Sequence, residues 1–312
     1  MKVVTISVFQ DDLDLLLDNP SSLTVTSSAR GTVKDKTNFN VDEDVSALRK
    51  AMEGLGTTEK TLIDVLTQRS NPQRQLIAKA YEKATGRTLI DDLKGDTHGD
   101  FEDLLVALVM PPALYDCHEV IKAMKGAGTT ESTLTEIFAS RSNKQIRELS
   151  EAYLAKTGRS MIQDLQSEVS GDYGKALLIL AEGKRDETTN VDAAKAKADA
   201  KALYEAGEKK WGTDEGKFID ILCHRSVPQL RQSGVCNSEL RLMEAYLISR
   251  FLGAGTTEST LTRIFVSRSE IDLIDIKVEY KKLFGCSLYS QLESEVSGDY
   301  GKTLKCLCGQ EE

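Results

Sequence analysis

A chain of 312 residues is long enough for about two domains of ordinary size and for a core without disulfide or metal staples. No apolar stretch reaches the roughly 18 residues of a membrane span. The formal net charge of −9, without a visible basic stripe, argues against nucleic acid as a partner. The same charge disfavours direct docking on an anionic membrane unless positive charge lies in between.

Cysteine usage and the N-terminus both indicate a cytoplasmic protein. The six cysteines are scattered and form no Cys-x-x-Cys pair, which argues against a zinc site and for reduced thiols. The short apolar run at residues 3–9 is followed at once by Asp11, Asp12 and Asp14, so it does not resemble a secretory signal. Residues 1–38 are predicted to form an N-terminal tail that is largely disordered, since residues 21–28 are rich in serine and threonine.

From residue 39 onward the chain repeats itself. A Gly-Thr pair inside a glycine-rich loop recurs at intervals of 72, 84 and 43 residues, and an Arg-Ser pair follows each of these glycines after 13 residues. We place repeat 1 at 39–110, repeat 2 at 111–182, a linker at 183–195, a truncated repeat 3 at 196–237 and repeat 4 at 238–312.

Within each repeat the apolar residues follow helical spacing. Leu62, Ile63 and Leu66 fall on one face, and no stretch alternates with period two for long enough to need a sheet. Thr57 is expected at a helix N-cap, and Gly86 and Gly158 are expected just past helix ends. The prediction is an all-α fold of about five short helices per repeat.

Repeat 3 is shorter than the others. After Gln232 roughly 35 residues are missing by comparison with the 72- and 84-residue intervals, so this repeat should keep two helices and part of a third. The loss should uncover the apolar faces of Phe218, Ile221 and Leu222 and loosen the repeat. Skipped exons or a faulty gene model would each produce such a gap.

The glycine-rich loops carry the candidate chemistry. Glycines two residues apart let the backbone turn tightly and point carbonyl oxygens outward. An acidic residue recurs 40 residues after the loop glycine in three repeats, as Asp96, Glu168 and Glu295. Carbonyls of Met52, Gly54 and Gly56 with the Asp96 carboxylate suit Ca²⁺, with weak affinity on the order of 10⁻⁴–10⁻³ M. One isolated loop of this kind would more simply be a helix–helix turn.

These loops with their distant acids resemble the annexins. Further motifs similar to that family are Arg69-Ser-Asn-Pro-Gln-Arg74, Lys209-Lys-Trp-Gly-Thr213 and Val266-Ser-Arg-Ser-Glu-Ile-Asp272, within a resemblance that spans about residues 39–309. It implies an array of five-helix repeats in a curved disc, here with repeat 3 incomplete. It also implies reversible, Ca²⁺-dependent binding to anionic phospholipid, chiefly phosphatidylserine, through loops on the convex face.

The resemblance assigns calcium ligands residue by residue. The primary ligands are Met52, Gly54, Gly56 and Asp96; Met124, Gly126, Gly128 and Glu168; Gly207, Lys210 and Gly212; and Phe251, Gly253, Gly255 and Glu295. Weaker secondary sites use Thr57 with Glu59, and Glu131, Glu215 and Glu258. Leu55, Ala127, Trp211 and Ala254 occupy the loop tips that would contact the membrane.

Two assignments stay open at this level. Some annexins have a hydrophilic central pore, whose charged positions would be Asp116, Glu119, Arg141 and Arg263; alternatively these residues form salt bridges between repeats. Self-association on membranes and non-classical release from the cell are also left open.

Two other classes of protein compete with a peripheral membrane organiser. A helical repeat scaffold for protein partners, having lost efficient membrane binding through the truncation, would explain the repeats but not the loops with their acids. An enzyme is disfavoured, because the chain has three histidines and no nucleophile–base or P-loop motif.

Overall fold

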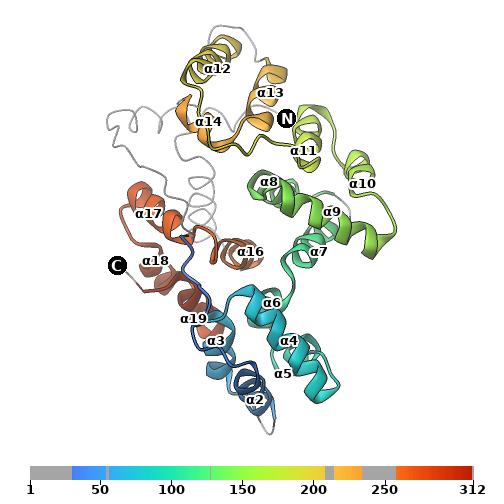
Figure 1. The fold of residues 1–312 in the computed structure, drawn as a ribbon, viewed down its shortest axis with the longest axis vertical. Helices are drawn as coiled ribbons and strands as arrows, with labels where there is room; N and C mark the ends of the chain where they lie inside the picture. Colours follow the sequence, from blue (N-terminus) through green and yellow to red (C-terminus); the bar gives the residue numbers. More distant parts are fainter. Residues whose placement is uncertain (1–29, 54–55, 127, 208–213, 234–257, 311–312) are drawn as a thin grey trace.

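The computed structural model describes residues 30–53, 56–126, 128–207, 214–233 and 258–310, and this part of the chain forms helices without a strand (Figure 1). Repeat 1 lies at the bottom of the view, repeat 2 on the right, repeat 3 at the top and the described part of repeat 4 on the left. The predicted all-α class is confirmed.

Repeats 1 and 2 have the same order of helices. Within the described residues of repeat 1 these are α2 (Val41–Met52), α3 (Glu59–Thr67), α4 (Asn71–Thr85), α5 (Leu89–Asp96) and α6 (Gly99–Val109). In repeat 2 they are α7 (Pro112–Met124), α8 (Glu131–Ser140), α9 (Asn143–Thr157), α10 (Met161–Glu168) and α11 (Gly171–Ala181).

The other two repeats are described in part. Repeat 3 contributes α12 (Ala193–Ala206), α13 (Glu215–His224) and the short α14 (Val227–Gln232). Repeat 4 contributes α16 (Glu258–Arg268), α17 (Leu273–Phe284), α18 (Leu288–Glu295) and α19 (Gly298–Cys308).

Local sequence signals explain where the third helix of a repeat begins and ends. Ser70 and Ser142 each form a capping box with the glutamine three residues later, at the first turns of α4 and α9. Gly86 and Gly158 end these helices in the left-handed conformation, at φ 73° and 70°, as expected. The Arg-Ser pair therefore marks a helix start in repeats 1, 2 and 3, whereas α17 of repeat 4 begins after Asp272.

The expected N-cap of α3 is wrong by one residue. The N-cap is Thr58, whose side chain makes no capping hydrogen bond. The Thr57 hydroxyl instead donates to the carbonyl oxygen of Asp96, at 3.1 Å. Thr57 thus joins the loop to the end of α5.

Repeats 1 and 4 share one hydrophobic core. Helices α3 and α6 pack against α16 and α19, and buried residues such as Leu66, Leu104 and Phe265 belong to a single cluster. Repeat 2 has a cluster of its own around Leu134 and Leu149.

Among the residues that the structure describes, repeat 3 has a small buried core. Leu203, Ile221 and Leu230 form it, and Ile221 is 1% exposed, so the expected uncovering of Ile221 is wrong. Phe218 and Leu222 are half-buried. Helix α13 packs on α11 of repeat 2, where the Leu222 carbonyl accepts a hydrogen bond from Arg185 Nη2 at 2.6 Å. The burial of Ile221 thus comes from the packing of α12, α13 and α14 on one another, and α13 also contacts α11 of repeat 2.

Residues 30–36 form a strap from repeat 4 to repeat 1. Arg30 N–H donates to the Ile271 carbonyl at 2.9 Å, and the Val33 N–H donates to the Ser269 carbonyl at 2.9 Å. The Lys36 N–H donates to Gln73 Oε1, on α4, at 3.0 Å. The expectation of a largely disordered tail over 1–38 is therefore wrong for this part.

Buried ion pairs brace the repeats from within. Arg69 makes two hydrogen bonds of 2.7 Å to Asp44, and Arg141 makes two of 2.8 Å to Asp116. Arg225 and Asp199 form the same pair in repeat 3, at 2.8 and 3.0 Å. Such bidentate pairs fix the helices that carry the two partners.

Arg263 joins repeat 4 to repeat 2. From α16 its guanidinium donates to Glu136 on α8 and to Glu119 on α7, with shortest distances of 2.8 and 2.9 Å. The Arg263 side chain is 4% exposed. Burial raises the pKa of the Glu136 carboxyl, and Arg263 opposes that rise.

We expect Gly31→Ala to lower the free energy of unfolding by about 1–3 kcal/mol. A Cβ at residue 31 would lie 2.3 Å from the backbone carbonyl carbon of Glu270, which cannot move aside as a side-chain tip can. Chemical denaturation measures the change. Gly95→Ala is the control, since that helical glycine has open space around it; equal stabilities of the two variants would contradict the strap's close packing.

We expect Arg263→Met to cost about 3–5 kcal/mol near neutral pH, because Glu119 and Glu136 then stay buried without a cation. Without Arg263 the pKa of Glu136 rises further, so the folded variant keeps a proton that the unfolded chain releases. The variant's stability should therefore fall as pH rises above the ordinary glutamate pKa of about 4.3. Urea denaturation at several pH values measures this.

Arg49→Met serves as the control for Arg263→Met. Arg49 pairs with Glu53 at the surface, where both side chains are more than half exposed, so its loss should cost less than about 1 kcal/mol. A cost at Arg263 no larger than at Arg49, or one independent of pH, would contradict the role given to the buried pair.

Candidate metal centre

In repeats 1, 2 and 3 a backbone hydrogen bond closes the loop between the first two helices. In repeat 1 the Thr58 N–H donates to the Ala51 carbonyl at 2.9 Å, and in repeat 2 the Thr130 N–H donates to the Ala123 carbonyl at 2.8 Å. In repeat 3 the Asp214 N–H donates to the Ala206 carbonyl at 2.9 Å across a loop that is one residue longer. The three loops thus have the same closure.

The loop glycines are needed for their backbone conformation. Gly56, Gly126 and Gly128 have φ of 101°, 116° and 121°, a region that side chains with a Cβ rarely adopt. No atom lies within 4 Å of where a Cβ would stand on any of them. The loops therefore turn tightly while their backbone stays open to a ligand.

The structure brings the distant acids to the loops. The Thr129 hydroxyl in the repeat 2 loop donates to Glu168 Oε2 at 2.9 Å. In repeat 1, Thr57 contacts the backbone of Asp96 in the same place. Both acids are exposed at the C-terminal ends of α10 and α5. A separation of 40 residues in sequence thus becomes contact in space.

This donor set fits Ca²⁺. Within the described ranges, no three His, Cys, Asp or Glu side chains gather as a group that could hold a metal ion. A cation at these loops would therefore depend on backbone carbonyls and one carboxylate, oxygen donors that suit Ca²⁺ and not zinc. The exposed position leaves room for water or a phosphate oxygen as further ligands.

The other predicted ligands divide into those that the structure describes and those that it does not. Met52 and Met124 are half-buried at the ends of α2 and α7, and Gly207 follows α12. Glu295 is exposed at the end of α18, the position that Asp96 and Glu168 have in their repeats. Outside the described residues lie Gly54, Leu55, Ala127, Lys210, Trp211, Gly212, Phe251, Gly253, Ala254 and Gly255.

The secondary-site acids share one position. Glu59, Glu131, Glu215 and Glu258 are each the first residue of a helix, namely α3, α8, α13 and α16. A carboxylate there faces the favourable end of the helix dipole.

Two tyrosines hold these helix starts, a role that the sequence reasoning missed. Tyr173 OH donates to the Glu131 carbonyl at 2.9 Å, and Tyr300 OH donates to the Glu258 carbonyl at 2.8 Å. The signal was the recurring Ser-Gly-Asp-Tyr motif, which positions α11 and α19. Repeat 1 has Phe101 at this position and lacks the hydroxyl.

The four pore candidates are all engaged in ion pairs. Asp116 and Arg141 pair within repeat 2, while Glu119 pairs with Arg263 across the interface with repeat 4. All four side chains are less than a tenth exposed. This is the geometry of the salt-bridge alternative, in which the charges hold helices and repeats together.

Comparison with known proteins agrees with this architecture. The annexin family model matches residues 43–108, 115–180, 198–233 and 245–307, and the third match is about half as long as the others. Annexin A3 of Mus musculus is 49% identical over 315 residues, covering 91% of this chain and 98% of the relative.

Solved structures give the same picture. A structure of annexin III matches with a TM-score of 0.84 at 47% identity, covering 91% of this chain and 98% of that one. A calcium-bound annexin (Sm)1 matches with a TM-score of 0.80 at 29% identity, covering 90% and 93%.

The matched family is not one of enzymes, and within the described residues no helix has both the length and the apolar character needed to cross a bilayer. Four matched segments cover most of the chain, and the glycine loops, their distant acids and the ion-paired repeats recur within them. The chain belongs to the annexin family of Ca²⁺-dependent phospholipid-binding proteins.

Proposed function

We propose that this chain binds anionic membranes of the phosphatidylserine type through calcium ions, as a cytoplasmic, peripheral and non-catalytic membrane organiser. The hydrogen bond between Thr129 and Glu168 carries the proposal, because it places a carboxylate beside an open glycine loop. Each ion would be held by that carboxylate and loop carbonyls, with remaining positions open to lipid phosphate oxygens.

The proposed primary ligands follow the repeats. In repeat 1 they are Met52, Gly54, Gly56 and Asp96, in repeat 2 Met124, Gly126, Gly128 and Glu168, and in repeat 4 Phe251, Gly253, Gly255 and Glu295. Thr57 with Glu59, Glu131, Glu215 and Glu258 would form secondary sites, and Leu55, Ala127, Trp211 and Ala254 would contact the lipid.

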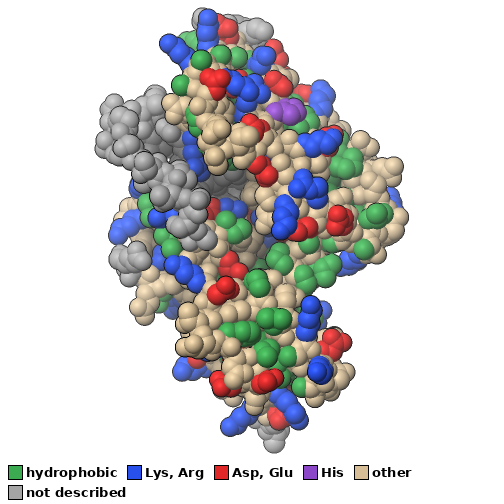
Figure 2. All heavy atoms as spheres, viewed as in Figure 1, with side chains coloured by type: hydrophobic (Ala, Val, Ile, Leu, Met, Phe, Trp, Pro, Cys, Tyr) green, Lys and Arg blue, Asp and Glu red, His purple; other side chains and the backbone are tan. Residues whose placement is uncertain are grey.

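Charge explains why calcium is required. The net charge of −9 repels an anionic surface, and the face in Figure 2 shows acidic and basic side chains interspersed without a basic stripe. Calcium ions at the loops would supply the positive layer between protein and lipid. The proposal therefore requires that binding disappears when calcium is chelated.

Repeat 3 would hold calcium poorly. Its loop carbonyls at Gly207, Lys210 and Gly212 keep the family pattern, but the position 40 residues after Gly212 is Leu252. Without a carboxylate, neutral carbonyls compete weakly with water for a divalent ion. We therefore propose three working primary sites.

A second function has one observation in its favour. The third family match is about half as long as the other three. A chain that had lost efficient membrane binding through this truncation could act as a helical scaffold for protein partners. Vesicle sedimentation separates this function from the first.

Replacing Asp96, Glu168 and Glu295 together by Ala should raise the calcium concentration needed for binding by at least about tenfold. Each substitution removes the only carboxylate of a primary site. Co-sedimentation with phosphatidylserine vesicles across a calcium titration measures this, with circular dichroism to verify the helical fold.

The matched control replaces three exposed acids away from the loops, Glu82, Glu148 and Glu151, by Ala. It changes the net charge equally and should leave the calcium requirement unchanged. Undiminished binding of the unaltered chain in excess chelator would overturn the calcium bridge. Absence of binding at saturating calcium would favour the scaffold.

Trp211 reports on the third loop because it is the chain's single tryptophan. Without vesicles, we expect its fluorescence to change only at calcium concentrations about tenfold or more above those that saturate the other loops, since the third loop lacks the acid 40 residues after its glycine. Calorimetric titration of the same sample locates the other sites. A Trp211 response with the affinity of the intact sites would contradict a crippled third loop.

A further inference from the structure

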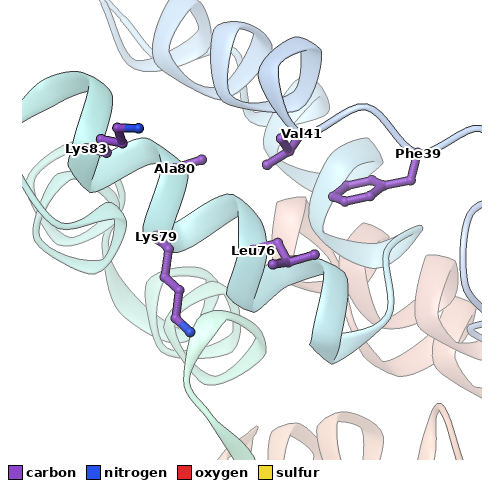
Figure 3. A pocket seen from close by; sticks show the side chains of 6 residues that line it. All are labelled: Phe39, Val41, Leu76, Lys79, Ala80 and Lys83. Carbon is purple, nitrogen blue, oxygen red and sulfur yellow. The ribbon is translucent and has the colours of Figure 1, made fainter.

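An apolar groove of about 360 Å³ lies in repeat 1, between α4 and the start of α2 (Figure 3). Leu76 faces Phe39 and Val41 across it, and Leu76 is 53% exposed. Lys79 and Lys83 extend from α4 along the same groove, and no carboxylate lines it. The groove thus offers apolar contact together with two positive charges.

Folding of the repeat does not require these side chains. Helix α9 has the same length, capping box and terminal glycine as α4, and it lies 72 residues further along the chain. At the positions of Leu76, Lys79 and Lys83 it carries Glu148, Glu151 and Ala155. Of these two matched helices, only α4 of repeat 1 therefore presents the apolar and basic side chains of the groove.

A ligand for this groove must bring apolar side chains and negative charge together. Residues 9–18 of this chain, which lie outside the described residues, have that composition. The segment contains Phe9, Leu13, Leu15, Leu16 and Leu17 with Asp11, Asp12, Asp14 and Asp18, and neither lysine nor arginine.

The length of the chain allows this segment to reach the groove. Arg30 is fixed on repeat 4, and nine residues separate it from Phe39 at the groove, a distance of at most about 30 Å. Twelve residues separate Arg30 from Asp18, which span up to about 40 Å when extended. The segment can thus return along the strap to repeat 1.

We infer that residues 9–18 dock in the groove of repeat 1 of the same molecule, with the leucines against Leu76 and the aspartates beside Lys79 and Lys83. The N-terminal segment would then be held on the first repeat beyond the strap. This contact does not depend on calcium or lipid, so its test is independent of the proposed function.

Zero-length carbodiimide coupling of the full chain tests the pairing. An equal mixture of isotopically light and heavy protein should give cross-links from Lys79 or Lys83 to Asp11–Asp18 within one chain. Cross-links of mixed light and heavy origin would show that a second copy occupies the groove, and absence of these cross-links would show that it is not the segment's site. Either result overturns the inference.

Hydrogen exchange with charge reversal provides the second measurement. K79E/K83E should raise the exchange rate of peptides from residues 9–18 about fivefold, because exposed ion pairs shift an equilibrium by a few-fold each. Adding D11K and D14K to that variant should restore slow exchange. The control K144E/K156E on α9 carries the same charge change; an equal effect of the control, or no effect at Lys79 and Lys83, overturns the inference.

Discussion

A calcium site of one carboxylate and a few carbonyls, as proposed for this chain, requires a scaffold that positions these ligands beforehand, and in repeats 1 and 2 the helices bring the acid to the loop. Glu168 meets its loop because α10 ends where α7 and α8 are joined. The buried Asp116–Arg141 pair fixes helix α7, which leads into that loop. A shift of any of these helices by a few ångströms would separate the carboxylate from the loop carbonyls. The buried Asp116–Arg141 pair therefore helps to position the loop although it does not contact a ligand.

The same kind of charge pair acts between repeats. Arg263 of repeat 4 is enclosed by two glutamates of repeat 2, while Arg74 of repeat 1 pairs with Glu270 of repeat 4 at 2.7 Å. A shared hydrophobic core already joins repeats 1 and 4. Repeat 2 has a separate core, so its position relative to repeat 4 depends more on the buried arginine. The loops of different repeats can present calcium to one surface only if these contacts are rigid.

Repetition is what made the fold predictable from the sequence. A single Gly-x-Gly-Thr loop has many explanations, whereas three copies with an acid at the same offset predict contact between the two. The terminal glycines of α4 and α9 were predictable as well, because a left-handed residue at a helix end favours glycine.

Other features escaped prediction because non-local packing decides them. The N-cap of α3 moved from Thr57 to Thr58 since the Thr57 hydroxyl finds a partner on α5. Ile221 is buried with Leu203 of α12 and Leu230 of α14, a packing between helices that the spacing of apolar residues along α13 alone does not reveal. The strap at residues 30–36 lacks apolar periodicity, and its order comes from hydrogen bonds to residues more than 200 positions away.

In repeat 3 the truncation leaves the first helices and the loop in place but removes the acidic ligand. The loop of this repeat keeps its closing hydrogen bond and its Asp199–Arg225 pair, which both lie before the deletion. The acid that would complete the site belongs to the missing segment, where an intact repeat supplies it 40 residues after the loop glycine. The described helices of repeat 3 pack on one another and α13 contacts α11, but none of these contacts places a carboxylate beside the loop. Under the proposed function, repeat 3 therefore keeps a core without binding calcium, and membrane binding depends on the other three repeats.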